Sequence, residues 1–157
     1  MKMKKPELIV YDFDGVMTDN KVLVDENGKE AVYVSRADGY GVSRIKQLGI
    51  KQIILSTEVN PVVAARAKKL GIPVIHGVED KKTILENYIK DNGFSHELIF
   101  YVGNDLNDYD AMQLAGTKCA PKDAEPEILE IADWVSEKNG GNGVIRELFR
   151  MISTMID

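Results

Sequence analysis

The sequence contains little cysteine and histidine, and this scarcity excludes two kinds of protein. The single cysteine, Cys119, has no partner for a disulfide within the chain, so a disulfide scaffold is excluded and nothing demands an oxidising compartment. We expect Cys119 to be a small buried apolar side chain. The two histidines, His76 and His96, stand far apart and do not form a zinc-ligand pattern.

Long apolar runs and an excess of positive charge are also missing. The apolar residues 8–11 are followed at once by Asp12, so this run is too short for a signal peptide or a membrane span. The formal net charge of −5 argues against a surface for nucleic acid or for an anionic membrane. We therefore expect a cytoplasmic protein that binds neither nucleic acid nor membrane.

The composition is that of one globular domain. The chain has 157 residues, of which 44% are hydrophobic and 29% charged, which is ordinary for a folded domain with its own core. The sequence shows no internal repeat, low-complexity segment or linker. We expect residues 1–157 to form a single domain.

Short apolar runs alternate with helical patterns along most of the chain. Strands are expected at residues 7–13, 53–55, 74–75, 98–102, 118–120 and 134–135. Helices are expected around residues 42–48, 61–70, 84–91, 110–115, 126–132 and 143–156. This order predicts an α/β fold, a three-layer Rossmann-like sandwich with a mostly parallel central sheet.

One segment does not follow this alternation. Two β-rich runs, residues 22–24 and 31–34, flank Asn27-Gly28, which is a strong signal for a hairpin turn. The segment of about residues 21–35 is therefore predicted to be a small β-hairpin inserted into the α/β fold.

Polar side chains follow several of the predicted strands. Asp12 and Asp14 end the first strand, Ser56 follows the second, Lys81 lies in the loop after the third, and residues 103–108 follow the fourth. In an open α/β sheet, ligands bind beyond the carboxyl ends of the strands. These residues are therefore predicted to meet at one edge of the sheet.

The residue types at this edge suit phosphate chemistry. Two carboxylates as close as Asp12 and Asp14 repel each other unless a cation lies between them, and Mg²⁺ prefers oxygen ligands. Asn104 and Asp108 are candidates to complete its oxygen shell. An ammonium group and a hydroxyl suit phosphate oxygens, and a carboxylate can accept a phosphoryl group. Lys81 and Ser56 are the predicted phosphate binders.

Each feature alone is more often an ordinary part of a surface. An Asp-x-Asp pair is usually a solvated turn, Lys81-Lys82 a helix start, and residues 104–108 a capped turn. Their shared position after strands favours a site over three unrelated turns.

The motifs resemble those of the haloacid dehalogenase superfamily over essentially the whole chain. Residues 11–18, Tyr-Asp-Phe-Asp-Gly-Val-Met-Thr, resemble its first motif, and Ser56, Lys81 and residues 103–108 resemble the next three. The hairpin, residues 36–41 and the tail at residues 140–147 are similar to a small branch without a cap domain. That branch contains 3-deoxy-D-manno-octulosonate 8-phosphate phosphatases and the phosphatase-like C-terminal part of some acylneuraminate cytidylyltransferases.

The resemblance implies a role for each motif residue. Asp12 would be the nucleophile, forming an aspartyl-phosphate, and would also bind Mg²⁺. Asp14 would be the general acid and base, with its carbonyl oxygen on the metal. Ser56 and Lys81 would hold the phosphoryl group, Asn104 would be a metal ligand, and Asp108 would orient a metal-bound water. Members of this branch are homotetramers, in which the hairpin builds the assembly and partly covers a neighbour's site.

Departures from the family pattern bear on metal and substrate. Most relatives have Asp where Asn104 stands, so this chain has one negative charge fewer for Mg²⁺. Octulosonate phosphatases usually have Gly-Arg where this chain has Thr57-Glu58. Glu58 and Lys69 resemble members that act on nine-carbon keto acids, which slightly favours a nonulosonate 9-phosphate over octulosonate 8-phosphate.

Residues after the hairpin and in the tail are further candidates. Arg36, Asp38 and Gly39 are expected to shape the mouth of the pocket, with Thr57 and Glu58 also near the substrate. For Arg146, an ion pair within its own segment and a contact with substrate are equally favoured.

Three functions remain at this point. The first is a Mg²⁺-dependent phosphatase of a 3-deoxy-2-keto sugar acid. The second is a non-catalytic tetramerisation module related to cytidylyltransferase domains, which Asn104 favours and the intact Asp12, Asp14, Ser56 and Lys81 oppose. The third is a phospho-acceptor receiver domain, in which the lysine follows the last acidic cluster, whereas Lys81 precedes it here.

Overall fold

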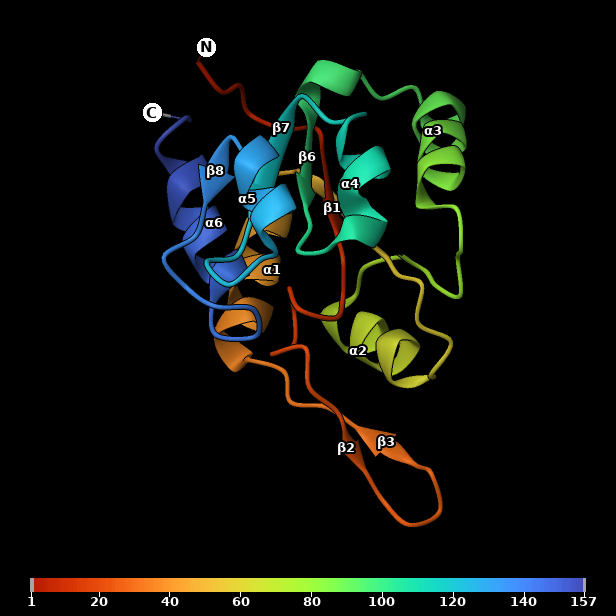
Figure 1. Cartoon of the computed structure of the whole chain (residues 1–157). Coiled ribbons are helices and arrows are strands. Elements are labelled where there is room, and N and C mark those ends of the chain that lie inside the picture. The colour runs from red at the N-terminus through yellow and green to blue at the C-terminus, as the bar shows by residue number, and fades with distance from the viewer. Residues whose placement is uncertain (1, 157) are drawn as a thin grey trace.

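A six-stranded parallel sheet forms the centre of the protein (Figure 1). The computed structural model describes residues 2–156. The strands are β1 (Leu8–Tyr11), β4 (Lys51–Leu55), β5 (Val74–Ile75), β6 (Ile99–Val102), β7 (Thr117–Ala120) and β8 (Trp134–Val135). Their order is β5-β4-β1-β6-β7-β8, and every neighbouring pair is parallel. The predicted mostly parallel sheet is confirmed.

Helices cover both faces of the sheet, because successive residues of a strand point to opposite sides. In β1, Ile9 and Tyr11 pack with α1 (Arg36–Gln47), α2 (Val62–Leu70) and α6 (Val144–Ser153). Leu8 and Val10 pack with α3 (Lys81–Asn92), α4 (Leu106–Met112) and α5 (Pro126–Ile131). The chain is thus the three-layer sandwich that the alternating pattern predicts.

The hairpin is the one insertion among the described residues, and no cap domain is present in residues 2–156. Strands β2 (Leu23–Val24) and β3 (Glu30–Ala31) pair antiparallel and project away from the body (Figure 1). Both are shorter than predicted, and the residues that do not pair, 22 and 32–34, lie at the open end of the hairpin. At the turn, Asp25 Oδ1 accepts hydrogen bonds from the backbone N–H groups of Asn27 and Lys29.

The fourth helix lies earlier in the chain than predicted. It begins at Leu106, because Asp105 caps it and the side chain of Asp108 accepts a hydrogen bond from the Asp105 backbone N–H in return. The expected helix at residues 110–115 overlaps only its last turn. Glycines in the left-handed region end α2 and α3, at Gly71 and Gly93, as predicted. No helix among residues 2–156 is both long and apolar enough to span a membrane.

Asp38 joins two helices on one face of the sheet. Its Oδ1 accepts a hydrogen bond of 2.9 Å from the backbone N–H of Ile145, at the start of α6. The two helices approach closely there, since a Cβ added to Gly41 would lie 2.7 Å from Arg146 N. Asp38 is only 2% exposed, so its expected place at a pocket mouth is not what the structure shows.

The anchoring of α6 by Asp38 makes stability depend on pH. Burial raises the pKa of Asp38 to about 6, despite backbone hydrogen bonds from Ile145, Gly143 and Arg146. The folded state therefore holds this proton more tightly than the unfolded chain. The associated stability is fully present below the unfolded pKa of about 3.9 and is lost as the pH rises through about 6.

We predict that Asp38→Asn removes this part of the pH dependence, because asparagine keeps the acceptor oxygen and does not ionise. Between about pH 4 and pH 7 the wild type should lose about 2 kcal/mol of unfolding free energy more than the variant. Urea denaturation of both proteins across this range measures it. Parallel curves would contradict the assignment.

Candidate active site

The polar residues predicted to meet do so at the carboxyl edge of the three central strands. Tyr11, the last residue of β1, pairs with Ile54 of β4 and Val102 of β6, so the residues that follow these strands lie at one level. A small cavity of about 60 Å³ opens there. Its lining residues are Asp12, Asp14, Asn20, Thr57, Asn104, Asp105 and Asn107.

Asp12 is fixed by its backbone and by one carboxylate oxygen. Its N–H donates to the Val102 carbonyl at 3.0 Å, which extends the pairing of β1 with β6 by one residue. Its Oδ1 accepts from Phe13 N at 2.7 Å and lies 3.1 Å from Lys81 Nζ. The side chain is thus held in one orientation, with Oδ2 facing Asn104.

Lys81 lies between two buried carboxylates. It is the first residue of α3, and its Nζ is 3.1 Å from Asp12 Oδ1 and 2.8 Å from Asp108 Oδ1. Burial lowers the pKa of Lys81, but the two carboxylates outweigh burial and raise the pKa overall, so the lysine is charged. Burial and the repulsion of Asp108 raise the pKa of Asp12, while Lys81 opposes both.

Asp108 lies behind the cavity and does not line it. Its Oδ1 accepts from Lys81 Nζ and, at 2.7 Å, from Tyr101 Oη, and its Oδ2 accepts from Asn104 N at 3.1 Å. Asp108 therefore fixes the lysine and the chain around Asn104. With both carboxylates ionised, the one ammonium leaves this buried group one negative charge in excess, which favours a further cation nearby.

Three polar groups provide a place for that cation. The terminal amide atom of Asn104 that faces the cavity lies 3.0 Å from Asp12 Oδ2 and 2.9 Å from the Asp14 carbonyl oxygen. With the amide oxygen in this position, three oxygens converge with no donor between them, as a hard cation requires. With the amide turned over, its nitrogen donates to both other oxygens. In the first orientation the donor set fits Mg²⁺, and in the second its hydrogen-bonding groups are paired without a metal.

This donor set contains only one carboxylate, that of Asp12. Among residues 2–156, no group of three His, Cys, Asp or Glu side chains is placed to hold a metal ion. The remaining oxygens here come from the Asn104 amide and a main-chain carbonyl. Gly15 allows this arrangement, since a Cβ at Gly15 would lie 1.9 Å from Asn104 Nδ2.

Asp14 and Glu58 are electrostatically coupled. Asp14 is partly exposed, and burial followed by the repulsion of Glu58 raises its pKa, while Lys81 opposes the rise. A raised pKa favours the protonated form that a general acid needs. Glu58 Oε1 accepts from Asn60 N at 2.8 Å, which holds it near the end of β4.

Ser56 and Thr57 continue β4 into the site. Ser56 is buried, its N–H donates to the Ile75 carbonyl at 2.9 Å, and its Oγ accepts from Glu58 N at 3.0 Å. Thr57 is exposed and lines the cavity. The predicted hydroxyl is thus at the correct edge, held as an acceptor by the loop that follows it.

Arg36, Gly39 and Lys69 lie in a different cavity. This basic cavity, of about 430 Å³, shares no lining residue with the small one at Asp12. It is lined by Arg36, Gly39, Ser43, Lys46, Arg66, Lys69 and Leu70. Arg66, whose Nη2 donates to the Ser35 carbonyl at 3.0 Å, was missed from the sequence, because the packing of α1 against α2 brings it beside Arg36.

The sequence also missed three residues that line the cavity at Asp12. Asn107 and Asp105 lie within the predicted segment 103–108, where only Asn104 and Asp108 were singled out. Asn20 has a positive φ of 66°, and no sequence pattern marks it. Arg146 neither lines these cavities nor forms an ion pair within its segment, since its guanidinium lies 4.1 Å over the ring of Tyr40.

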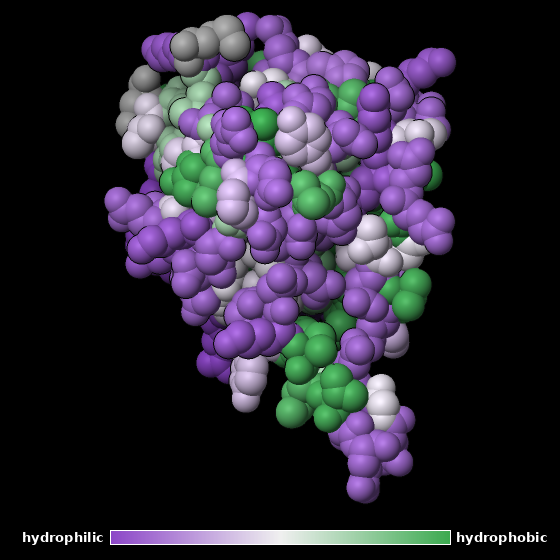
Figure 2. Space-filling view, in the orientation of Figure 1, coloured by the Kyte–Doolittle hydropathy of each residue, from purple (hydrophilic) through white to green (hydrophobic). Residues whose placement is uncertain are grey.

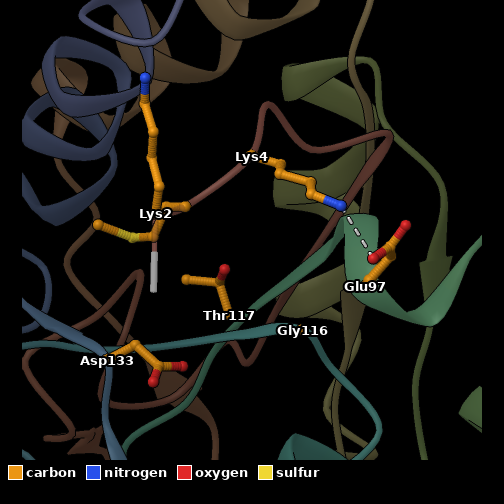
Figure 3. A pocket seen from close by; sticks show the side chains of 7 residues that line it. Lys2, Lys4, Glu97, Gly116, Thr117 and Asp133 are labelled. Atoms are coloured by element: carbon orange, nitrogen blue, oxygen red, sulfur yellow. Dashed lines mark hydrogen bonds and ion pairs between the residues drawn. The ribbon is translucent and has the colours of Figure 1, made fainter.

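Another cavity lies at the amino ends of the strands (Figure 3). Its volume is about 370 Å³, and its charged residues Lys4, Glu97 and Asp133 have partners nearby. Lys4 Nζ lies 3.0 Å from Glu97 Oε2, and Asp133 Oδ2 accepts from Lys118 N at 2.7 Å. The absence of a convergent polar set makes this cavity a poor candidate for chemistry.

Known proteins resemble the chain over most of its length. The N-acylneuraminate cytidylyltransferase A of Danio rerio is 29% identical over 91% of this chain, which spans about a third (34%) of that relative. The 3-deoxy-D-manno-octulosonate 8-phosphate phosphatase of Haemophilus influenzae is 30% identical over 96% of this chain and 84% of its own length.

Two solved structures show the same fold. A putative hydrolase of the haloacid dehalogenase family from Streptomyces avermitilis is 40% identical, with a TM-score of 0.91 over 98% of this chain and 88% of that chain. The 3-deoxy-D-manno-octulosonate 8-phosphate phosphatase of Moraxella catarrhalis, in complex with magnesium, phosphate and KDO, is 31% identical. Its TM-score is 0.91 over 96% of this chain and 87% of that chain.

The sequence profile of the haloacid dehalogenase-like hydrolases matches residues 43–148, which is more than half of the chain. This match agrees with the relatives and with the strand-end arrangement of Asp12, Ser56, Lys81 and Asn104. The chain therefore belongs to the haloacid dehalogenase-like hydrolases.

Proposed function

We propose that the protein is a Mg²⁺-dependent phosphatase that hydrolyses the phosphate monoester of a 3-deoxy-2-keto sugar acid. The observation that carries the proposal is the buried Asp12–Lys81–Asp108 group, whose excess negative charge faces a cavity with cation-binding oxygens. Relatives named as phosphatases of an octulosonate 8-phosphate, and a relative named as an acylneuraminate cytidylyltransferase, support the substrate class.

In the first half of the reaction, Asp12 is the nucleophile. Its carboxylate attacks phosphorus, the bond from phosphorus to the sugar oxygen breaks, and Asp14 gives its proton to the departing alkoxide. Phe13 N and Lys81 Nζ hold Asp12 in position for attack, which reduces the entropy lost in reaching the transition state.

In the second half, Asp14 acts as the base. It takes a proton from water, which attacks the aspartyl-phosphate, so that Asp12 is restored and phosphate leaves. Lys81 and the hydroxyl of Ser56 hold the phosphoryl oxygens. Asp12, the Asp14 carbonyl and Asn104 would hold Mg²⁺, which supplies positive charge against the phosphoryl group.

Asp108 acts through its neighbours in this proposal. It fixes Lys81 and the backbone at Asn104, and through Asn104 it affects the place where a metal-bound water would lie. We therefore treat it as a positioning residue for the lysine and the metal ligand.

The sugar must extend beyond the small cavity. A volume of about 60 Å³ is far below the roughly 300 Å³ or more of a typical small-molecule pocket, so it suits a phosphoryl group and not a whole sugar acid. Thr57 and Glu58 lie at this edge and would contact the sugar hydroxyls. Arg36, Gly39 and Lys69 stay predicted substrate contacts, in a cavity separate from the one at Asp12.

Assembly as a homotetramer is part of the proposal. The hairpin carries exposed apolar side chains, with Leu23 70% and Tyr33 83% exposed, and Figure 2 shows an apolar patch in this part of the molecule. A patch of this kind on a projecting hairpin is typical of a protein interface. A second copy of the chain is the proposed occupant.

A non-catalytic assembly module is the second candidate. It is favoured by Asn104, because the amide nitrogen can donate to both Asp12 and the Asp14 carbonyl and so satisfy the site without a metal. It predicts an assembled protein that shows no Mg²⁺-linked binding of a phosphate mimic.

The first prediction of this proposal concerns turnover. Wild type with Mg²⁺ should release phosphate from a nonulosonate 9-phosphate, and more slowly from octulosonate 8-phosphate. Asp12→Asn should lower kcat by about a thousandfold or more while the fold survives, since the nucleophile is lost. Circular dichroism and phosphate release measure both.

The results with these substrates test the role of Glu58, the mechanism and the alternative function. A preference for the eight-carbon acid keeps the enzyme and discards the role given to Glu58. Release by Asp12→Asn at the wild-type rate would overturn the mechanism. No Mg²⁺-dependent release from either acid, nor from N-acetylneuraminate 9-phosphate, would favour the assembly module.

The second prediction concerns Asn104. Asn104→Asp adds a second carboxylate to the donor set, so it should tighten Mg²⁺ binding by about tenfold, as changes at ligand positions commonly do. Without Mg²⁺ the variant should be less stable than wild type, because the new carboxylate faces Asp12 Oδ2 and loses the amide donor. Calorimetric titration and thermal unfolding with and without Mg²⁺ test both parts; unchanged affinity would contradict the proposed site.

The third prediction concerns the hairpin. Leu23→Lys places a charge in the apolar patch and should shift the protein from tetramer toward smaller species in sedimentation experiments. Asn27→Lys adds the same charge at the exposed turn and is the matched control, expected to remain tetrameric. A monomeric wild type would exclude this assembly.

A further inference from the structure

The loop that precedes α6, here called the tail loop, packs against the loop that carries Asp14, here called the Asp14 loop. The backbone N–H of Gly141 donates to the Val16 carbonyl at 2.9 Å. A Cβ added to Gly140 would lie 1.9 Å from the Gly15 carbonyl oxygen and 2.9 Å from that of Thr18. No side chain fits between the two loops at this point, because real Cβ atoms do not approach backbone so closely.

Gly15 is also packed on its other side. A Cβ there would lie 1.9 Å from Asn104 Nδ2, so the residue lies between the tail loop and the amide that faces Asp12. Two glycines, Gly140 and Gly15, thus allow the tail loop, the Asp14 loop and the Asn104 side chain to touch. Gly15, which follows the Asp14 carbonyl, is therefore enclosed between the tail loop and Asn104.

The Asp14 loop is held by hydrogen bonds within itself. Met17 N donates to the Phe13 carbonyl at 2.8 Å, and the buried hydroxyl of Thr18 accepts from Gly15 N at 3.2 Å and from Asn20 N at 3.1 Å. Gly15 is thus bonded to the rest of its turn through Thr18.

The tail loop is held from behind by the segment after β7. Asp123 Oδ1 accepts from Gly140 N at 2.9 Å. Two residues later, Glu125 N donates to the Asn104 carbonyl at 2.9 Å. One short segment thus bonds to both the tail loop and the chain of the proposed metal ligand.

We infer that Gly140, supported by Asp123, is a positioning residue that sets the spacing between the Asp14 carbonyl and Asn104, and thereby the affinity of the site for a divalent cation. The inference rests on the proposed function, because it concerns the same cation site. It adds two residues, distant in sequence from the strand-end motifs, that touch neither substrate nor cation.

The test compares two alanine variants with similar steric conflicts. Gly140→Ala places a methyl group against the Gly15 carbonyl. Gly116→Ala places one against the Glu97 carbonyl, at 2.3 Å, near the amino-end cavity on the far edge of the sheet (Figure 3). Neither glycine has a positive φ, so alanine meets steric conflict only. Both variants should lose stability.

Only Gly140→Ala should weaken Mg²⁺ binding, by about tenfold or more, as changes in residues that orient ligands do. Calorimetric titration with MgCl₂, well below the melting temperature of each variant, measures the affinity. Asp123→Ala should weaken binding in the same direction, and Asp123→Asn, which keeps the acceptor oxygen, should restore it. Wild-type affinity in Gly140→Ala, or equal losses in both glycine variants, would overturn the inference.

A metal-free measurement separates this inference from the proposed function. In amide NMR spectra without Mg²⁺, Gly140→Ala should shift the resonances of residues 14–18 and of Asn104, whereas Gly116→Ala should not. Shifts that stay within the tail loop would overturn the spacing role even if wild type binds Mg²⁺. If wild type binds no Mg²⁺ and these shifts still occur, the cation site fails while the coupling of the two loops stands.

Discussion

The site is organised around one unbalanced buried charge. Asp12 and Asp108 share the ammonium of Lys81, at 3.1 and 2.8 Å, in a largely buried region. One ammonium cannot neutralise two carboxylates, and an isolated buried charge is costly. Two features of the surrounding structure offset this imbalance. Tyr101 and backbone N–H groups donate hydrogen bonds to Asp108, and oxygens that can bind a cation lie next to Asp12.

The parallel sheet makes this arrangement possible. Because β1 lies between β4 and β6, the residues after all three strands emerge at one level, and the N-terminus of α3 brings Lys81 to the same place. Both faces of β1 are buried, so the strand cannot slip without exposing core residues. The precision of the site therefore depends on the core beneath it as much as on its own hydrogen bonds.

Strand ends and motif order were enough to predict the fold and the convergence of Asp12, Asp14, Ser56, Lys81 and Asn104. These features are local in sequence, since apolar runs and the polar residues after them can be read directly. The burial of Asp38 against α6 and the separation of Lys69 from Asp12 could not be predicted, because both depend on how helices pack. For the same reason, the pairing of Asp108 with Lys81 was not anticipated.

The contact between Gly140 and Gly15 joins segments about 125 residues apart in the chain. Contacts of such long sequence separation form late in folding, because much loop entropy is lost before they are made. During synthesis, the ribosome would release the acidic loop long before the glycines that pack behind it. A nascent chain would thus carry its carboxylates without their final spacing, and would gain that spacing only when nearly the whole domain has emerged.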